Sequence, residues 1–137
     1  MDEYNSLLAQ QSAKQAEYNA CSSRIGRCDY LLGRLRPVKE AVAAKKREFD
    51  SIQKEDKRIT KSKQSWKGEN YRSYQSKGAE LLNEDNSFYI RTMDHILDSL
   101  NNEITRIENE RLSEYGLLGR IGAALNSLAN KIENFFN

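Results

Sequence analysis

The sequence is poor in residues that interrupt regular structure. It contains one proline, Pro37, and seven glycines among 137 residues, which is too few for a loop-rich β fold. No window approaches the roughly 18 consecutive apolar residues that a membrane-spanning helix needs. These scarcities exclude a β-rich fold and indicate long helices that bury a narrow apolar stripe.

The sequence also has few residues that carry chemistry. It holds one histidine, His95, and two cysteines, Cys21 and Cys28. His95 follows Asp94, but no partner groups are spaced around it for acid–base work. On a helix the two cysteines are roughly 10 Å apart, too far for a disulfide within that helix, and they lack zinc spacing. We therefore predict no enzyme activity, no metal and no cofactor, with the cysteines as small apolar core residues.

Charge is plentiful but unevenly distributed. The net charge is +2 with 31% charged residues, so nothing overall indicates nucleic-acid binding. Residues 24–63 carry thirteen Lys/Arg against six Asp/Glu, a net of +7, whereas residues 69–111 carry five against nine, a net of −4. The two blocks lie on opposite sides of a central stretch that contains Trp66 and Gly68. If the chain reverses there, segments of opposite charge face each other.

The first half has a helical spacing of apolar residues. The apolar residues at this spacing are Tyr4, Leu7, Tyr18, Cys21, Ile25, Cys28, Leu32 and Leu35, and the polar residues Gln11 and Lys14 occupy two further positions of the same pattern. After Pro37 the apolar residues resume in a shifted phase, at Val38, Val42, Phe49, Ile52 and Ile59. We predict one helix over residues 3–63, bent near Pro37, because proline kinks or breaks a helix. Two helices that meet at residues 36–37 are the alternative.

The second half has a more regular heptad pattern, which only Arg111 and Glu114 interrupt. Its members are Met93, Leu97, Leu100, Ile104, Ile107, Leu118, Ile121, Leu125, Leu128, Ile132 and Phe135, with Tyr71, Tyr74, Leu81 and Tyr89 as an approximate backward extension. We predict a second helix over residues 71–136. The three glycines at residues 116–122 indicate either a break in this helix or the close approach of another helix. A turn at residues 64–70 then gives an all-α, single-domain antiparallel hairpin.

The apolar stripe is wider than a two-helix seam requires. Second apolar residues stand beside seam positions in Leu81-Leu82, Phe88-Tyr89, Ile96-Leu97 and Leu117-Leu118. A helix in a larger bundle needs about three apolar positions in seven, against two for a two-helix seam. We therefore predict that a partner chain adds further helices. The predicted interface comprises Tyr71, Tyr74, Phe88, Tyr89, Leu97, Leu100, Ile104, Ile107, Leu118, Ile121, Leu125, Leu128 and Ile132.

The central stretch W66-K-G-E-N-Y-R-S-Y74 resembles the WXG100 superfamily of small helical-hairpin proteins. The resemblance covers Trp66 and Gly68, the aromatic Tyr74 six residues after Gly68, the position at mid-chain and the two flanking helices. The chain is longer than is usual in that family. In its length, its polar first helix and its WKGEN turn, it is more similar to the YwqH-like proteins encoded beside LXG toxins in Gram-positive bacteria.

This resemblance implies a partner protein of type VIIb secretion. Such a protein binds the helical N-terminal region of an LXG toxin and helps to form the export signal read by the secretion machinery. A second small helical accessory protein is a further candidate partner. Trp66 and Gly68 would form the hairpin tip and contribute to recognition. The family's aromatic-x-x-x-acid motif is missing here. The residue four positions after Tyr89 is Met93, and the residue four positions after Tyr115 is Gly119, so neither is acidic. The acidic half of a bipartite signal must then come from the partner chain.

Two other functions compete with this one: a secreted WXG100-like homodimer and an unrelated structural coiled-coil protein. Binding at a membrane surface is a weaker alternative, because the C-terminal apolar segment carries few cations. The start, MDEYNSLLAQQ, lacks the basic residues and apolar run of a secretory signal. The expected location is cytoplasmic before export, followed by secretion with the toxin without a cleavable signal peptide.

Overall fold

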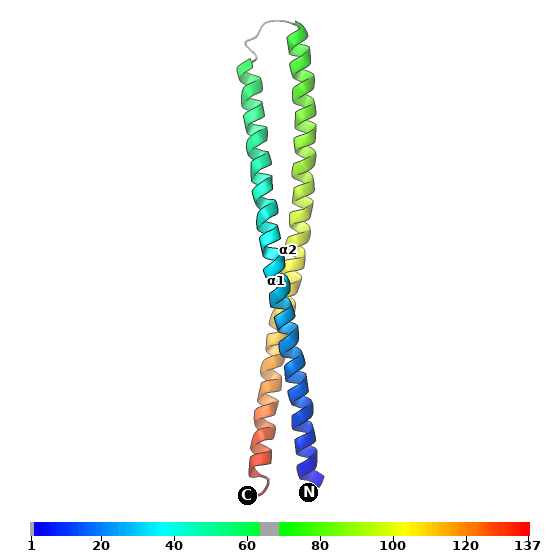
Figure 1. The fold of residues 1–137 in the computed structure, drawn as a ribbon, viewed down its shortest axis with the longest axis vertical. Coiled ribbons are helices and arrows are strands. Elements are labelled where there is room, and N and C mark those ends of the chain that lie inside the picture. The colour runs from blue at the N-terminus through cyan, green and yellow to red at the C-terminus, as the bar shows by residue number, and fades with distance from the viewer. Residues whose placement is uncertain (1, 64–68) are drawn as a thin grey trace. The chain divides into compact units, whose positions relative to one another are not determined.

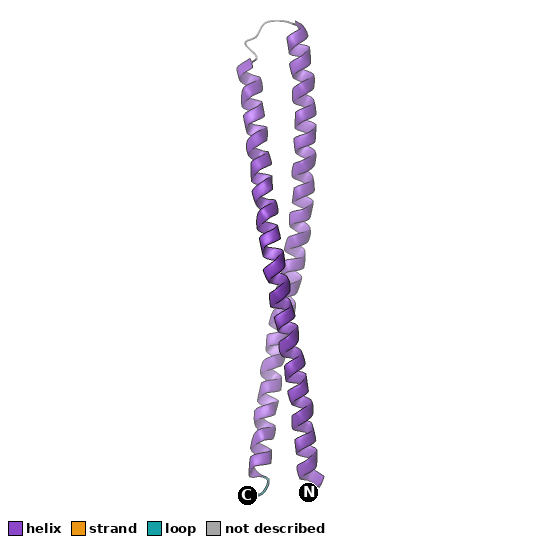
Figure 2. Cartoon of the chain, viewed as in Figure 1, coloured by secondary structure: helices purple, strands orange, loops and turns teal. Residues whose placement is uncertain are grey.

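The protein consists of two long helices that pack against each other. The computed structural model describes the backbone of residues 2–63 and 69–137 and the side chains of residues 2–55 and 84–137. Helix α1 spans Asp2–Lys63 and helix α2 spans Glu69–Asn134, and no strand occurs in these described segments (Figures 1 and 2). The helices run in opposite directions, as in a hairpin (Figure 1). The predicted all-α fold of two packed antiparallel helices is thus confirmed.

The helix boundaries differ from the prediction by a few residues. Helix α1 continues through Pro37, so the single-helix interpretation is correct and the two-helix alternative is wrong. Glu69 and Asn70, which the prediction assigned to the turn, are the first residues of α2. At its other end α2 finishes at Asn134, where the amide of Phe135 donates to the carbonyl of Ile132 at 3.3 Å. Trp66 and Gly68 lie outside the described residues.

The predicted break at the three glycines is absent. Helix α2 runs unbroken through Gly116, Gly119 and Gly122, and no glycine among the described residues has a positive φ. A Cβ on Gly116 or Gly119 would meet nothing within 4 Å, and one on Gly122 would meet the Tyr18 ring at 4.0 Å. The three glycines are therefore weak helix formers, but they are not hinges. The seam residues around them pack against α1 and keep this segment helical.

The chain divides into two compact units. Unit 1 comprises residues 1–34 and 104–137, and unit 2 comprises residues 35–103. Each unit therefore contains a segment of α1 packed along a segment of α2. Within the described helices, none is long and apolar enough to cross a membrane.

Unit 1 contains the well-packed part of the hairpin. Its buried apolar residues recur at alternating steps of three and four, which turns one face of each helix toward the other. They are Cys21, Ile25, Cys28 and Leu32 on α1, and Ile104, Ile107, Ile121 and Leu128 on α2. The half-buried positions that continue the same spacing include the four polar residues Gln11, Lys14, Arg111 and Glu114. The heptad predicted for this part of the chain is confirmed residue by residue.

In unit 2 the predicted change of phase after Pro37 does not occur. The less exposed positions of α1 continue in steps of four and three, at Leu35, Lys39, Val42, Lys46, Phe49 and Gln53. Val38 and Ile52, which the prediction assigned to the seam, are instead about half exposed. The prediction followed the apolar residues, whereas the helix keeps its register and accepts polar residues in the seam. On α2 the seam runs through Asn86 and Ile90, not through the exposed Tyr89.

Candidate interaction surface

The described residues offer surfaces, and not an enclosed site. No group of three or more His, Cys, Asp or Glu side chains among them could hold a metal ion. The hollows on the helix pair are open to solvent; one, in unit 1, lies between Glu3 and Leu7 on α1 and Asn130 and Phe135 on α2. The main features of the described residues are therefore the polar contacts that join the two helices and the apolar side chains that remain exposed.

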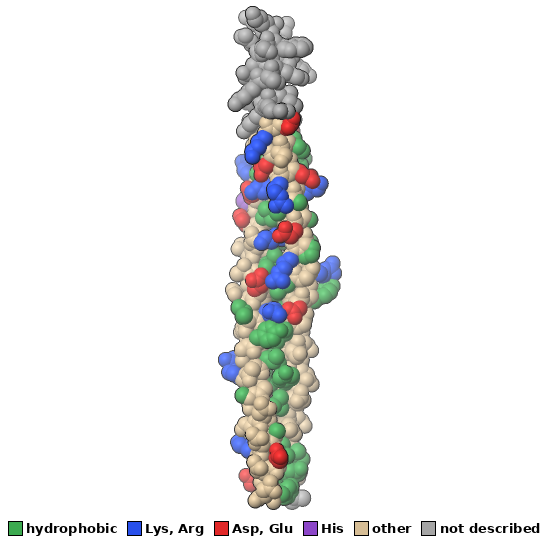
Figure 3. Space-filling model, turned by 90° about the vertical axis from the view of Figure 1, so that its left-hand side faces the viewer, with side chains coloured by type: hydrophobic (Ala, Val, Ile, Leu, Met, Phe, Trp, Pro, Cys, Tyr) green, Lys and Arg blue, Asp and Glu red, His purple; other side chains and the backbone are tan. Residues whose placement is uncertain are grey.

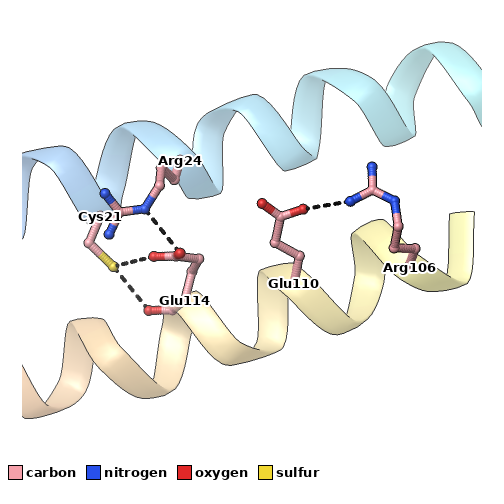
Figure 4. A network of polar contacts seen from close by, with 5 residues as sticks. All are labelled: Cys21, Arg24, Arg106, Glu110 and Glu114. Atoms are coloured by element: carbon pink, nitrogen blue, oxygen red, sulfur yellow. Dashed lines mark hydrogen bonds and ion pairs between the residues drawn. The ribbon is translucent and has the colours of Figure 1, made fainter. Parts of the chain in front are cut away.

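A polar layer lies inside the seam of unit 1 (Figure 4). Nε of Arg24 donates to Oε1 of Glu114 at 3.0 Å, and Sγ of the buried Cys21 lies 3.1 Å from both Oε2 and the main-chain carbonyl oxygen of Glu114. A thiol has one proton, so it serves one of these acceptors at a time. The hydrogen bonds from Arg24 and Cys21 lower the pKa of Glu114 below its usual value. Glu114 is thus an ionised group that the opposite helix satisfies.

The pKa values of the two buried thiols are raised as well. Burial, with the hydrogen bond to Glu114 as a second cause, raises the pKa of Cys21. Burial also raises the pKa of Cys28, and the nearby charge of Glu110 adds to it. Both cysteines are free and buried, so they act as neutral core residues, in agreement with the sequence analysis.

Ion pairs between the helices are found in both units. In unit 1, Nε of Arg111 donates to Oδ1 of Asp29 at 2.5 Å. In unit 2, Nζ of Lys46 lies 2.5 Å from Oδ1 of Asp94, and this hydrogen bond raises the pKa of Lys46. The charged seam residue Arg111, which interrupted the predicted heptad, is therefore paired with the opposite helix. Because these side chains are substantially exposed, solvent screens each pair, and each contributes little to stability.

An aromatic cluster holds the two ends of the chain together in unit 1. The Tyr4 ring lies 5.5 Å from the Phe135 ring and 5.0 Å from the Phe136 ring, centroid to centroid. The two phenylalanine rings are 5.1 Å apart and meet edge to face, an arrangement that aromatic quadrupoles favour. These contacts stabilise the first turn of α1 against the two residues that directly follow α2.

Most residues of the predicted partner interface contact the chain's own first helix. Ile104, Ile107, Ile121 and Leu128 are buried, and the other seam members are half-buried, namely Leu97, Leu100, Leu118, Leu125 and Ile132. Phe88 and Tyr89 are exposed. Tyr71 and Tyr74 belong to α2, but their side chains lie outside the described ones. Of the described members of that set, Phe88 and Tyr89 are thus the ones with large exposed surface.

Exposed apolar residues also occur outside the predicted partner interface. The large hydrophobic side chains that are exposed include Tyr30, Leu112, Tyr115 and Phe136 in unit 1, and Val38, Ile52, Phe88, Tyr89 and Ile96 in unit 2. The view in Figure 3 shows hydrophobic side chains between charges of both signs in the part next to the grey atoms, and a strip of them with few charges near the termini. The spacing of these residues in the sequence could have identified them. Val38 and Ile52 are fourteen residues apart, and Tyr89 and Ile96 are seven residues apart. Each pair therefore repeats with the heptad but just outside the seam.

The described side chains of unit 2, those of residues 35–55 and 84–103, bury little apolar surface. Met93 is the buried hydrophobic residue among them, and the other eight belong to unit 1. Lys39, Lys46, Gln53 and Asn86 occupy this part of the seam, and the Nδ2 atom of Asn86 is buried with no hydrogen-bond partner among the described residues. The described part of unit 2 therefore combines few buried apolar side chains with several exposed ones.

A comparison of the chain with protein-family models, with curated proteins and with solved structures found no match.

Proposed function

We propose that the chain is a non-enzymatic accessory protein that binds the helical N-terminal region of an LXG toxin and assists its export by a type VIIb secretion system. The observation that carries the proposal is the surplus of exposed apolar side chains on two packed helices, which occurs among the described residues of both units. A helix pair of this kind gains stability when further helices cover those side chains. The W66-K-G motif supports the choice of partner by its resemblance to WXG100-like proteins.

Co-expression tests this proposal directly. The chain and the N-terminal helical region of a toxin encoded beside it are produced together, with an affinity tag on the toxin region alone. The expected result is a complex that survives size-exclusion chromatography at constant stoichiometry. Failure of the two chains to co-purify, with both soluble, would contradict the proposal.

The role of the central motif requires a separate measurement. Trp66→Ala is expected to leave the complex intact and to reduce export of the toxin, because the resemblance assigns Trp66 to recognition by the secretion machinery. Trp66→Phe is the matched control, since it retains a large aromatic ring. Unchanged export by Trp66→Ala would favour the unrelated structural coiled-coil protein.

A homodimer remains the second candidate, since exposed apolar residues also suit self-association. Light scattering of the isolated chain separates the two. The accessory role predicts that the isolated chain stays largely monomeric and that the toxin region forms the complex. A tight, well-folded dimer that does not exchange with the toxin region would favour the homodimer.

A further inference from the structure

We infer that residues 36–55 of α1 are a displaceable cover over α2, and that a helix from another chain takes their place. The inference rests on the proposed function only for the natural source of that helix, and it adds where the helix binds and which side chains it brings. The surface concerned is the seam of α2 in unit 2. We call it the α2 stripe, and its residues are Asn86, Ile90, Met93, Leu97 and Leu100.

The two helices contribute unequally to this part of the seam. On α2, Asn86 is the one polar member of the stripe, and the other four residues are apolar. On α1, three of the five seam residues within the cover are polar. The five are Lys39, Val42, Lys46, Phe49 and Gln53. An apolar stripe on α2 is therefore covered by a helix that is mostly polar on its facing side.

The register of the two segments sets polar residues of the cover against the stripe. Two contacts define this register: Lys46 pairs with Asp94, and the Phe49 ring stacks on the Tyr89 ring at 5.3 Å. The opposed pairs that follow from it are Lys39 with Leu100, Lys46 with Met93, and Gln53 with Asn86. A lysine keeps its charged end in water, so only its alkyl stem covers apolar surface. The cover thus buries the stripe less favourably than an apolar helix would.

Unit 1 provides the comparison for a well-matched seam. There the α1 residues Cys21, Ile25, Cys28 and Leu32 are all buried. In the described part of unit 2, Met93 is the one hydrophobic side chain buried to that degree, and Nδ2 of Asn86 is buried with no hydrogen-bond partner among the described residues. Displacing residues 36–55 therefore costs less than opening unit 1, which confines the exchange to unit 2.

The structure shows the form of the occupant, because α1 already fills the position. A partner that takes its place is a helix antiparallel to α2, with side chains facing the stripe at alternating steps of three and four residues. It gains over α1 by bringing apolar side chains to the positions that Lys39, Lys46 and Gln53 now hold. The occupant is therefore an amphipathic helix whose facing side is apolar throughout.

A second copy of the chain does not fit this position better than α1 does. Exchange of residues 36–55 between two copies restores the same polar seam, so it gains no apolar contact. Two α2 stripes could pair with each other, but residues 84–103 carry one Lys/Arg against five Asp/Glu, a net of −4 with His95 neutral. Two such segments repel each other, whereas the present cover carries six against four, a net of +2. The occupant therefore comes from a different chain.

Synthetic peptides test the exchange on the full-length chain. The native peptide has the sequence of residues 36–55, with Pro37 in the first turn, where a helix tolerates it. The leucine peptide has leucine in place of Lys39, Lys46 and Gln53. The control peptide has its three leucines one position later, in place of the exposed residues Glu40, Arg47 and Lys54.

The leucine peptide is expected to bind at least about tenfold more tightly than the other two peptides. The native peptide competes poorly with the same segment inside the chain, because tethering gives that segment an effective concentration on the order of millimolar. The control peptide has the same number of added leucines but the same polar facing side as α1. Equal affinity of the leucine and control peptides, measured by calorimetry, would overturn the inference.

Hydrogen exchange followed by mass spectrometry distinguishes replacement of the cover from binding on the outside of the pair. When the leucine peptide binds, the amides of residues 36–55 of the chain should lose protection, while those of residues 84–103 retain it. A helix that adds to the intact pair would leave both segments protected. That result would show that α1 is not displaced.

Variants of the cover separate the inference from the proposed function. The double variant Lys39→Leu and Gln53→Leu strengthens the cover, so its affinity for the co-purified toxin region should fall at least about tenfold, because the fraction of open chains limits binding. Arg47→Leu, at an exposed position, should bind as the wild type does. If the wild-type chains do not co-purify, the proposed function fails, and the peptides still test the exchange. If they co-purify and the double variant binds as the wild type does, the function stands and the inference is wrong.

Discussion

Cys21 and Glu114 meet across the helix pair although 93 residues separate them: Sγ of Cys21 lies 3.1 Å from Oε2 and from the carbonyl oxygen of Glu114. Arg24 donates to the other carboxylate oxygen. A thiol and a guanidinium from one helix therefore satisfy one carboxylate from the other. Because the three residues must be in register, this layer fixes how the helices of unit 1 align.

The first prediction concerns acid stability. Since the pKa of Glu114 is lowered in the folded chain, its contribution to stability is present above the unfolded pKa of about 4.3 and is lost as the pH falls through the folded pKa. The unfolding temperature of the wild type should therefore fall more steeply with acidification than that of Glu114→Gln. Glu17→Gln, at an exposed carboxylate paired with Lys14, is the control. Parallel curves for the wild type and Glu114→Gln would contradict the prediction.

The second prediction concerns thiol reactivity. Cys21 and Cys28 are buried, and burial raises the pKa of both thiols, so little reactive thiolate is accessible. Under native conditions at mildly alkaline pH, both should react with a thiol reagent only as fast as the helices open. Ser22→Cys adds an exposed thiol next to Cys21 and should add one fast equivalent. Two fast equivalents in the wild type would show that the seam is open.

The third prediction concerns the core of unit 1. Ile107 is 1% exposed, so Ile107→Ala leaves a cavity and should lower the free energy of unfolding by about 2–5 kcal/mol. Leu112→Ala, five residues later on the exposed face, should change it by less than about 0.5 kcal/mol. Urea titrations followed by circular dichroism give both values. Equal effects of the two substitutions would place the seam on another face of α2.

The fourth prediction concerns the glycines of α2. A Cβ on Gly119 meets nothing within 4 Å, so Gly119→Ala should raise the free energy of unfolding by about 0.5–1 kcal/mol. Ala123→Gly, at an exposed position one turn later, should lower it by a similar amount. A loss of stability in Gly119→Ala would indicate that the glycine serves a close contact with a partner.

The fifth prediction concerns the unpaired amide in unit 2. Asn86 is 7% exposed and its Nδ2 has no partner, and such a buried polar group costs about 1–3 kcal/mol. Asn86→Leu should therefore raise the unfolding temperature of the isolated chain. Asn102→Leu, on the exposed face, is the control and should have little effect. If Asn86→Leu destabilises the chain, the amide contributes a favourable contact.

The sequence predicted one level of organisation well. Heptad spacing is a repeated signal, and along residues 93–135 of α2 every predicted seam position is at least half-buried, with Arg111 and Glu114 included as paired polar members. The existence of both helices followed from the scarcity of proline and glycine. Regular packing between two helices depends on local periodicity, and local periodicity can be read directly.

The prediction failed where the polar and apolar patterns diverge. After Pro37 it followed Val38 and Ile52, but the seam passes through Lys39 and Gln53. A helix keeps its register when a few seam positions are polar, provided that the other seam positions pack against the opposite helix. The hydrophobicity of individual residues does not reveal this. The cross-helix partners of Arg111 and Glu114 could not be predicted, because they depend on the register of one helix relative to the other.

The aromatic cluster has a consequence for how the molecule could be extended. Tyr4 contacts both Phe135 and Phe136, and the two termini lie at the same end of unit 1 (Figure 1). Sequences fused to the first and last residues would therefore leave the protein side by side. A short linker between those residues would close the polypeptide into a ring without disturbing the helices, and a circular permutant opened elsewhere should retain the packing of unit 1.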